Sequence, residues 1–179
     1  MDVFESDDTQ ESSFRLSNKS SAGQFLPADG RSAFSKDSRY RQTLAIPEYD
    51  LYGNPRYVRS RTAPRITYYY WGYNGLHPVA EIKNADPSVA SSVAIDHAAD
   101  TLSSKDMAVL NGLRSDSRFR NAEITTYTYE PLIGMVSATD PQGLTTYYDY
   151  DDQGRLREVY FMENGTKRTL KYYDYNYKK

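Results

Sequence analysis

The histidines are the first residues to test for chemistry, because imidazole serves both metal binding and proton transfer. The sequence has two, His77 and His97, and no cysteine. Without thiols, disulfides and thiolate metal sites are excluded. His77 stands before Pro78 at the start of an expected strand, and His97 lies on an expected helix. Neither has partners at a metal or catalytic-triad spacing, so we expect structural or surface roles for both.

Three aspartates around residue 150 resemble part of a calcium loop. Counting from Asp149, Gly154 takes the sixth place of an EF-hand loop, where glycine is required. The twelfth place should hold a bidentate glutamate, and here it is Tyr160. The flanking segments also have strand patterns rather than helical ones. We therefore expect Asp149, Asp151 and Asp152 to cap turns, and no metal is predicted.

Paired carboxylates could catalyse glycoside hydrolysis. The candidates are Glu123, Glu130, Asp140 and Glu158. Nothing in their spacing singles out a pair. The sequence thus predicts no catalytic residue and no cofactor, and we expect that the protein is not an enzyme.

Aromatic side chains offer another kind of site, because exposed rings stack on sugars. Trp71 and Tyr73 are the candidates for such a surface. The competing interpretation is that the aromatic residues pack against one another. Both interpretations stay open at this point.

Tyrosine dominates the composition, with 18 Tyr against 6 Phe and 1 Trp in 179 residues. Its large ring with a polar end suits half-buried strand faces. The net charge of −2 argues against nucleic acid as a partner. No apolar run approaches the roughly 20 residues of a membrane span, and the acidic, polar first residues do not form a signal peptide.

The elements that must position these residues are mainly β. Residues 1–43 are polar and are predicted to form an extended or disordered arm. Residues 44–85 and 121–179 alternate in polarity and are predicted to be antiparallel β-hairpins. The expected strands are 44–49, 56–59, 65–70, 78–83, 124–130, 135–139, 144–150, 156–162 and 169–177, with a turn at 71–75.

Residues 86–120 are predicted to form a small two-helix insertion. Asp86-Pro87 has the pattern of an N-cap followed by proline in the first turn. Val89, Val93 and His97 then follow at four-residue spacing. A second cap is expected at Ser103 with Asp106, followed by a short helix that carries Met107, Val109, Leu110, Leu113 and Arg114.

The hairpins repeat. Tyrosine pairs two residues apart recur at 127 and 129, at 148 and 150, and at 173 and 175, and glycines follow them at turns. In each unit, aspartate can cap the turn and glycine can supply its positive φ. The residues expected to form the repeat are Tyr127, Tyr129, Gly134, Tyr148, Tyr150, Asp151, Gly154, Arg155, Leu156 and Gly165. We expect stacked hairpins to bury a continuous tyrosine ladder.

The stretch YYDYDDQGRL at 147–156 resembles the YD-repeat motif, in which tyrosine and aspartate are followed by two variable residues and Gly-Arg-Leu. The matching residues are Tyr150, Asp151, Gly154, Arg155 and Leu156. The other copies are degenerate. Tyr129 is followed by Glu130, and Tyr49-Asp50 lacks Gly-Arg-Leu after Gly53. With these copies, residues 44–179 are similar to the C-terminal part of large bacterial YD-repeat (Rhs-type) proteins.

The resemblance implies a secreted or surface-displayed β-sheet shell, which in such proteins can enclose a toxin. The expected function is therefore a non-catalytic structural repeat protein or fragment. Its expected partners are neighbouring repeats, or a second copy that pairs through a sheet edge. A carbohydrate-binding surface module is the alternative, and a degenerate toxin-associated enzyme ranks last.

Overall fold

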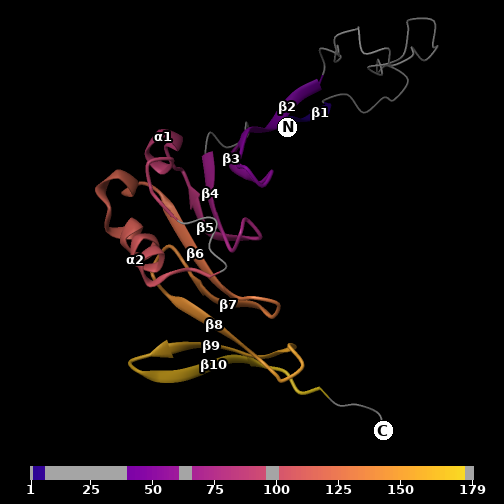
Figure 1. Ribbon diagram of the computed structural model, residues 1–179, viewed down its shortest axis with the longest axis vertical. Coiled ribbons are helices and arrows are strands. Elements are labelled where there is room, and N and C mark those ends of the chain that lie inside the picture. The colour runs from indigo at the N-terminus through magenta and orange to yellow at the C-terminus, as the bar shows by residue number, and fades with distance from the viewer. Residues whose placement is uncertain (1, 7–39, 61–65, 96–100, 176–179) are drawn as a thin grey trace, which may run out of the picture. The chain divides into compact units, whose positions relative to one another are not determined.

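The computed structural model describes residues 2–6, 40–60, 66–95 and 101–175 (Figure 1). The chain divides into two compact units, Met1–Ala45 with Ser60–Pro64, and Ile46–Arg59 with Arg65–Lys179. In the first unit, β1 (Asp2–Ser6) pairs antiparallel with the first part of β2 (Tyr40–Tyr49). Most of the predicted arm, residues 7–39, lies outside the described residues.

The second unit is an antiparallel sheet, so the mainly β fold with hairpin pairing is confirmed. From β3 onward, each strand pairs with the next one in the sequence. The strands are β3 (Pro55–Ser60), β4 (Ile66–Gly72), β5 (His77–Lys83), β6 (Glu123–Glu130), β7 (Gly134–Thr139), β8 (Thr145–Tyr150), β9 (Leu156–Glu163) and β10 (Thr166–Tyr172).

The core lies between β3–β6 and the helical insertion, which follows one side of these strands in Figure 1. Tyr68 and Tyr70 of β4 are almost fully buried opposite Ile82 and Ala80 of β5. The Tyr70 hydroxyl donates a hydrogen bond of 2.7 Å to the Ala90 carbonyl of the insertion. The buried hydrophobic residues are Tyr57, Tyr68, Tyr70, Tyr73, Val79, Ala80, Ile82, Ala85, Ala90, Ile95, Leu110, Leu113, Phe119 and Ile124.

The buried tyrosines should make the fold sensitive to alkali. Burial, followed by the nearby charge of Glu81, raises the pKa of Tyr127 to about 12, and burial also raises the pKa of Tyr70. In the unfolded chain a tyrosine loses its proton near pH 10. Stability from these groups is therefore complete below about pH 10 and is lost as the pH rises to about 12. The urea concentration at the unfolding midpoint should decrease from pH 8 to pH 10 and to pH 11. In the Tyr127→Phe variant this decrease should be smaller. A midpoint that stays constant to pH 11 would contradict this prediction.

The helical insertion has both predicted caps. Asp86 accepts from the Ser88 N–H at the start of α1 (Pro87–Ala90), which carries proline in its first turn. Ser103 and Asp106 form a reciprocal capping box at the start of α2 (Ser104–Gly112). Two 3₁₀ turns follow, Leu113–Ser115 and Ser117–Phe119.

The first predicted helix is shorter than expected. The prediction that Val93 continues it was wrong, because α1 ends at Ala90. The Ser91 and Ser92 hydroxyls donate to the carbonyls of Ser88 and Val89. Such bonds satisfy the last carbonyls of the helix locally and compete with its continuation. His97 lies outside the described residues.

Three further details differ from the predictions. Trp71 and Gly72 belong to β4 rather than to a turn. Strict alternation along 78–83 would place Val79 on the face opposite Ala80 and Ile82, yet all three are fully buried. The register with β4 shifts between Tyr70 and Trp71 and skips Val79, which breaks the alternation. The last strand ends at Tyr172, and residues 176–177 of its predicted range lie outside the described residues.

Among the described residues, no helix is both long enough and apolar enough to cross a membrane.

Candidate functional site

Three turns of the second unit share one hydrogen-bonding pattern, which we call the Asp-Gly turn. They are Asp50–Asn54, Asp140–Leu144 and Asp151–Arg155. In each, the aspartate N–H donates to the carbonyl of the fifth residue at 2.8–3.0 Å, and the glycine at the fourth place donates to the aspartate carbonyl. The aspartate Oδ1 accepts from the N–H groups of the third and fifth residues at 2.8–3.0 Å. One carboxylate thus fixes the whole loop.

The fourth place requires glycine. Gly53, Gly143 and Gly154 have φ values of +83°, +89° and +73°, which other residues rarely adopt. The sequence match between Tyr49-Asp50-Gly53 and Tyr150-Asp151-Gly154 is therefore also a structural match, because both turns share the same hydrogen bonds and a glycine with positive φ. The remaining turn, Asp140–Leu144, follows Thr139 instead of a tyrosine, so the tyrosine pattern did not identify it as a copy.

Of the three aspartates in the calcium-like stretch, Asp151 caps a turn as predicted, Asp149 pairs with Arg157 instead, and Asp152 is exposed. Arg155 Nε lies 2.7 Å from Asp151 Oδ2, and Arg157 Nη2 lies 2.6 Å from Asp149 Oδ2. The Arg155 hydrogen bond lowers the pKa of Asp151, and the Arg157 hydrogen bond lowers that of Asp149. In the part of the chain that the structure describes, no group of three or more His, Cys, Asp or Glu side chains could hold a metal ion.

A second repeated contact joins the end of one strand to the start of the preceding strand. We call it the aromatic clamp. Trp71 Nε1 donates to the Pro55 carbonyl at 2.9 Å. The Tyr150 hydroxyl donates to the Met135 carbonyl at 2.8 Å, and the Tyr175 hydroxyl to the Leu156 carbonyl at 2.8 Å.

Tyr129 occupies the equivalent place between β6 and β5 and makes a ring contact. Its ring stacks on the His77 ring, with centroids 4.3 Å apart and planes inclined by 11°. The Tyr73 ring meets both of these rings edge-on, and the Tyr129 N–H donates to the Tyr73 hydroxyl at 2.9 Å. His77 is therefore part of an aromatic packing cluster.

Three of the four clamp residues directly follow a shift in strand register. The shifts lie between Tyr70 and Trp71, between Thr128 and Tyr129, and between Asp149 and Tyr150. A bulge redirects the side chain that follows it. The expected two-residue alternation of tyrosines on one face is therefore interrupted, because the second tyrosine of a pair is turned toward the neighbouring strand.

The other predicted repeat residues lie at separate places in the sheet. Tyr127 donates to Glu81 at 3.3 Å, and Tyr148 lies opposite Val159. Gly134 passes beneath Tyr150, where an added Cβ would lie 2.8 Å from the hydroxyl oxygen. Gly165 follows Asn164 in the β9–β10 hairpin turn, and both have positive φ, as the Asn-Gly pattern predicts.

The two proposed sugar-stacking residues have different surroundings. Tyr73 is only 5 % exposed and packs within the aromatic cluster. Trp71 is half-buried, and its ring centroid lies 6.4 Å from that of Tyr69. The structure does not bring Trp71 and Tyr73 together into one exposed platform.

The candidate carboxylates also have structural partners. Asp140 caps an Asp-Gly turn, and Glu158 accepts from Lys167 and Thr169. Glu123 and Glu130 are the first and last residues of β6, so the strand holds them at opposite ends.

Arg114 has a role that the sequence did not indicate. Its guanidinium donates to the carbonyls of Ile124, Thr139 and Asp140 and to the Thr126 hydroxyl, at 2.9–3.2 Å. It thereby ties the helical insertion to β6 and to the end of β7. No local pattern distinguishes this arginine from its neighbours, because all of its partners are distant in the sequence.

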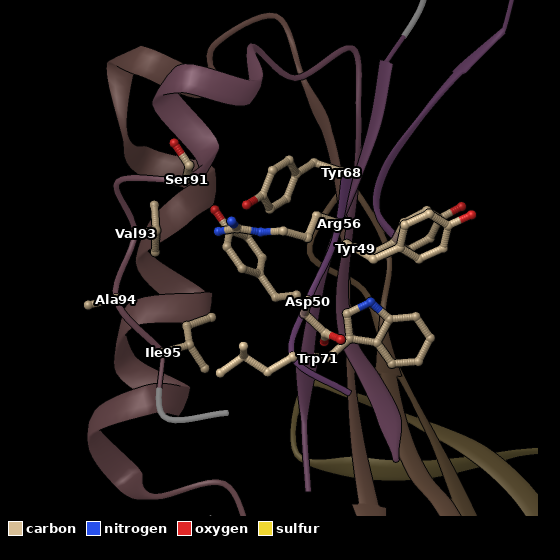
Figure 2. Close-up of a pocket in the computed structure, with 12 residues that line it drawn as sticks. Tyr49, Asp50, Arg56, Tyr68, Trp71, Ser91, Val93, Ala94 and Ile95 are labelled. Atoms are coloured by element: carbon tan, nitrogen blue, oxygen red, sulfur yellow. The ribbon is translucent and has the colours of Figure 1, made fainter. Parts of the chain in front are cut away.

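A cavity of about 380 Å³ lies between β3–β4 and the segment that follows α1 (Figure 2). Arg56 and Tyr68 point from the strands toward Ser91, Val93 and Ile95. The Trp71 and Tyr49 rings lie on the other side of the strands in this view. Sequence reasoning missed this site because its walls come from three separate segments.

A scan against protein-family models finds no match to this chain, and searches of curated proteins and of solved structures also find none.

Proposed function

We propose that this protein is a non-catalytic structural protein, whose hairpins stack like the repeats of a bacterial YD-repeat (Rhs-type) shell that is exported or displayed at the cell surface. The observation that carries the proposal is the recurrence of one turn and one clamp along the sheet. The Asp-Gly turn occurs three times and the aromatic clamp four times within one unit.

This repetition favours an architectural role, because each Asp-Gly turn and each aromatic clamp only connects neighbouring strands. The turn aspartates use their carboxylates on backbone N–H groups, and the clamp residues use their polar ends on backbone carbonyls or neighbouring rings. Side chains with such roles specify a stack of hairpins.

The proposed partners are neighbouring repeats that continue the sheet. β10 is the last strand of the described sheet, and all seven of its residues are exposed. An edge strand offers backbone groups to another strand. Lys167, Arg168 and Lys171 lie along it, and such charges limit indiscriminate pairing.

The test replaces the equivalent aspartates one at a time. Asp50→Ala, Asp140→Ala and Asp151→Ala should each lower the urea unfolding midpoint, because each change leaves two turn N–H groups without their acceptor. Asp152→Ala is the matched control, since this exposed neighbour should change the midpoint far less. Hydrogen exchange should increase mainly in the two strands that flank each altered turn, as expected of a repeat. Equal effects of Asp151→Ala and Asp152→Ala would contradict the proposal.

Carbohydrate binding is the second candidate, favoured by the neighbouring rings of Tyr69 and Trp71. A glycan array separates the two functions. Binding that Tyr69→Ala abolishes would support a sugar surface, and an array without signal would leave the architectural role. Tyr69 is the better residue to change, because Trp71 also holds the Pro55 carbonyl.

A further inference from the structure

The cavity beside Arg56 has the size and the walls of a small-molecule site. Its volume of about 380 Å³ falls within the range of ligand pockets. Its polar groups come from the Asp50 turn, β3, β4 and Ser91, and its apolar groups come from Leu51, from the aromatic rings and from the segment after α1. Nothing in the turn or clamp pattern requires such a cavity.

Arg56 provides the charge in this site. Its guanidinium lies 3.8 Å from Glu48, a separation too long for a hydrogen bond, and both side chains are substantially exposed. Such a pair contributes little to stability, so a better-placed anion can replace Glu48. Asp50, whose carboxylate lies in the cavity wall, already accepts from the Tyr52 N–H and from two N–H groups of Asn54.

Tyr68 provides a second polar group beside Arg56. The side chain is 3 % exposed, and it lies beside the Arg56 side chain in Figure 2. Burial raises the pKa of Tyr68, and the charge of Arg56 offsets part of this rise. The hydroxyl therefore keeps its proton at neutral pH. A guanidinium next to a hydroxyl is a donor set that suits a carboxylate.

The rest of the cavity wall suits an apolar group. Val93 and Ile95 lie across from the ring of Tyr68 (Figure 2). Leu51 also lines the cavity and is fully exposed, so a ligand there would cover apolar surface that now faces water.

From this arrangement we infer that the cavity binds a small organic acid, with its carboxylate on Arg56 and Tyr68 and its apolar body against Val93 and Ile95. The expected ligand is an aryl or short alkyl compound that carries one carboxylate. This site is independent of the architectural role, since it uses neither a turn aspartate as a ligand group nor a clamp hydroxyl.

Calorimetric titration with phenylacetate tests the inference. Wild-type protein should bind phenylacetate, and Arg56→Gln should weaken binding by about 10- to 100-fold, as expected for loss of a charge-assisted hydrogen bond. The uncharged analogue phenylacetamide should bind wild type at least about tenfold more weakly. Backbone NMR shifts on binding should concentrate at residues 91–95.

Arg59→Gln is the matched control, because Arg59 is an exposed residue of the same strand outside the cavity wall. It should leave phenylacetate affinity unchanged. Unfolding curves establish that Arg56→Gln is folded, and Arg56→Lys, which keeps the charge, should recover part of the affinity. The inference is overturned by equal binding of acid and amide, by full affinity in folded Arg56→Gln, or by no binding to wild type at millimolar concentration.

Discussion

Arg114→Ala should lower the free energy of unfolding by about 2–4 kcal/mol, measured by urea denaturation at neutral pH. The wild-type guanidinium donates to three carbonyls and one hydroxyl that belong to β6 and to the end of β7. Burial lowers the pKa of Arg114, because the guanidinium is partly withdrawn from water. Removing it leaves several acceptors without a donor and detaches the insertion from the sheet.

Arg118→Ala is the control for this experiment. Arg118 lies in the next 3₁₀ turn and is exposed, and it pairs with Asp116 two residues away and donates to the Ser92 hydroxyl. Exposed local pairs contribute little, so the midpoint should hardly move. If the two arginine variants were equally stable, Arg114 would not be the link between insertion and sheet.

Tyr70→Ala should cost still more, about 3–5 kcal/mol, because the side chain is large and fully buried. Tyr70→Phe separates the contribution of the hydroxyl hydrogen bond from that of the packed ring. It keeps the ring but leaves the buried Ala90 carbonyl without its 2.7 Å donor, which should cost about 1–3 kcal/mol. Both losses in the free energy of unfolding can be measured by urea denaturation, provided that the dependence of this free energy on urea concentration keeps the same slope.

Tyr69→Ala provides the comparison on the adjacent residue. Tyr69 lies opposite Glu81 on β5 and is only half-buried. Its removal should destabilise the protein clearly less than removal of Tyr70. A larger loss for Tyr69 would mean that the core lies on the other face of the sheet.

The features that could be predicted from the sequence are those fixed by near neighbours in the chain. The Asn164-Gly165 hairpin turn, the Asp151–Arg155 turn and the Ser103 capping box each depend on a few consecutive residues. Their geometry follows from side-chain acceptors and from glycine φ. The strands between Arg56 and Met162 were predicted within two residues for the same reason, because polarity alternates locally.

The features that could not be predicted depend on partners far along the chain. The register shifts before Trp71, Tyr129 and Tyr150 are properties of strand pairs, and single-strand alternation does not reveal them. The Arg114 contacts and the Arg56 cavity each join separate segments. The error at Val93 had a local cause, because serine hydroxyls competed with the continuing helix.

The pairing of consecutive strands has a consequence for how the chain folds. Hairpins such as β9–β10 close over a two-residue turn, so most of the sheet forms by short-range contacts, which are associated with rapid folding. The pairing of β5 with β6 is different, because the whole segment from Asn84 to Ala122 separates the two strands. Closing this loop costs entropy before any contact is gained. We therefore expect the closing of this loop to be the slow step that joins the two halves of the sheet.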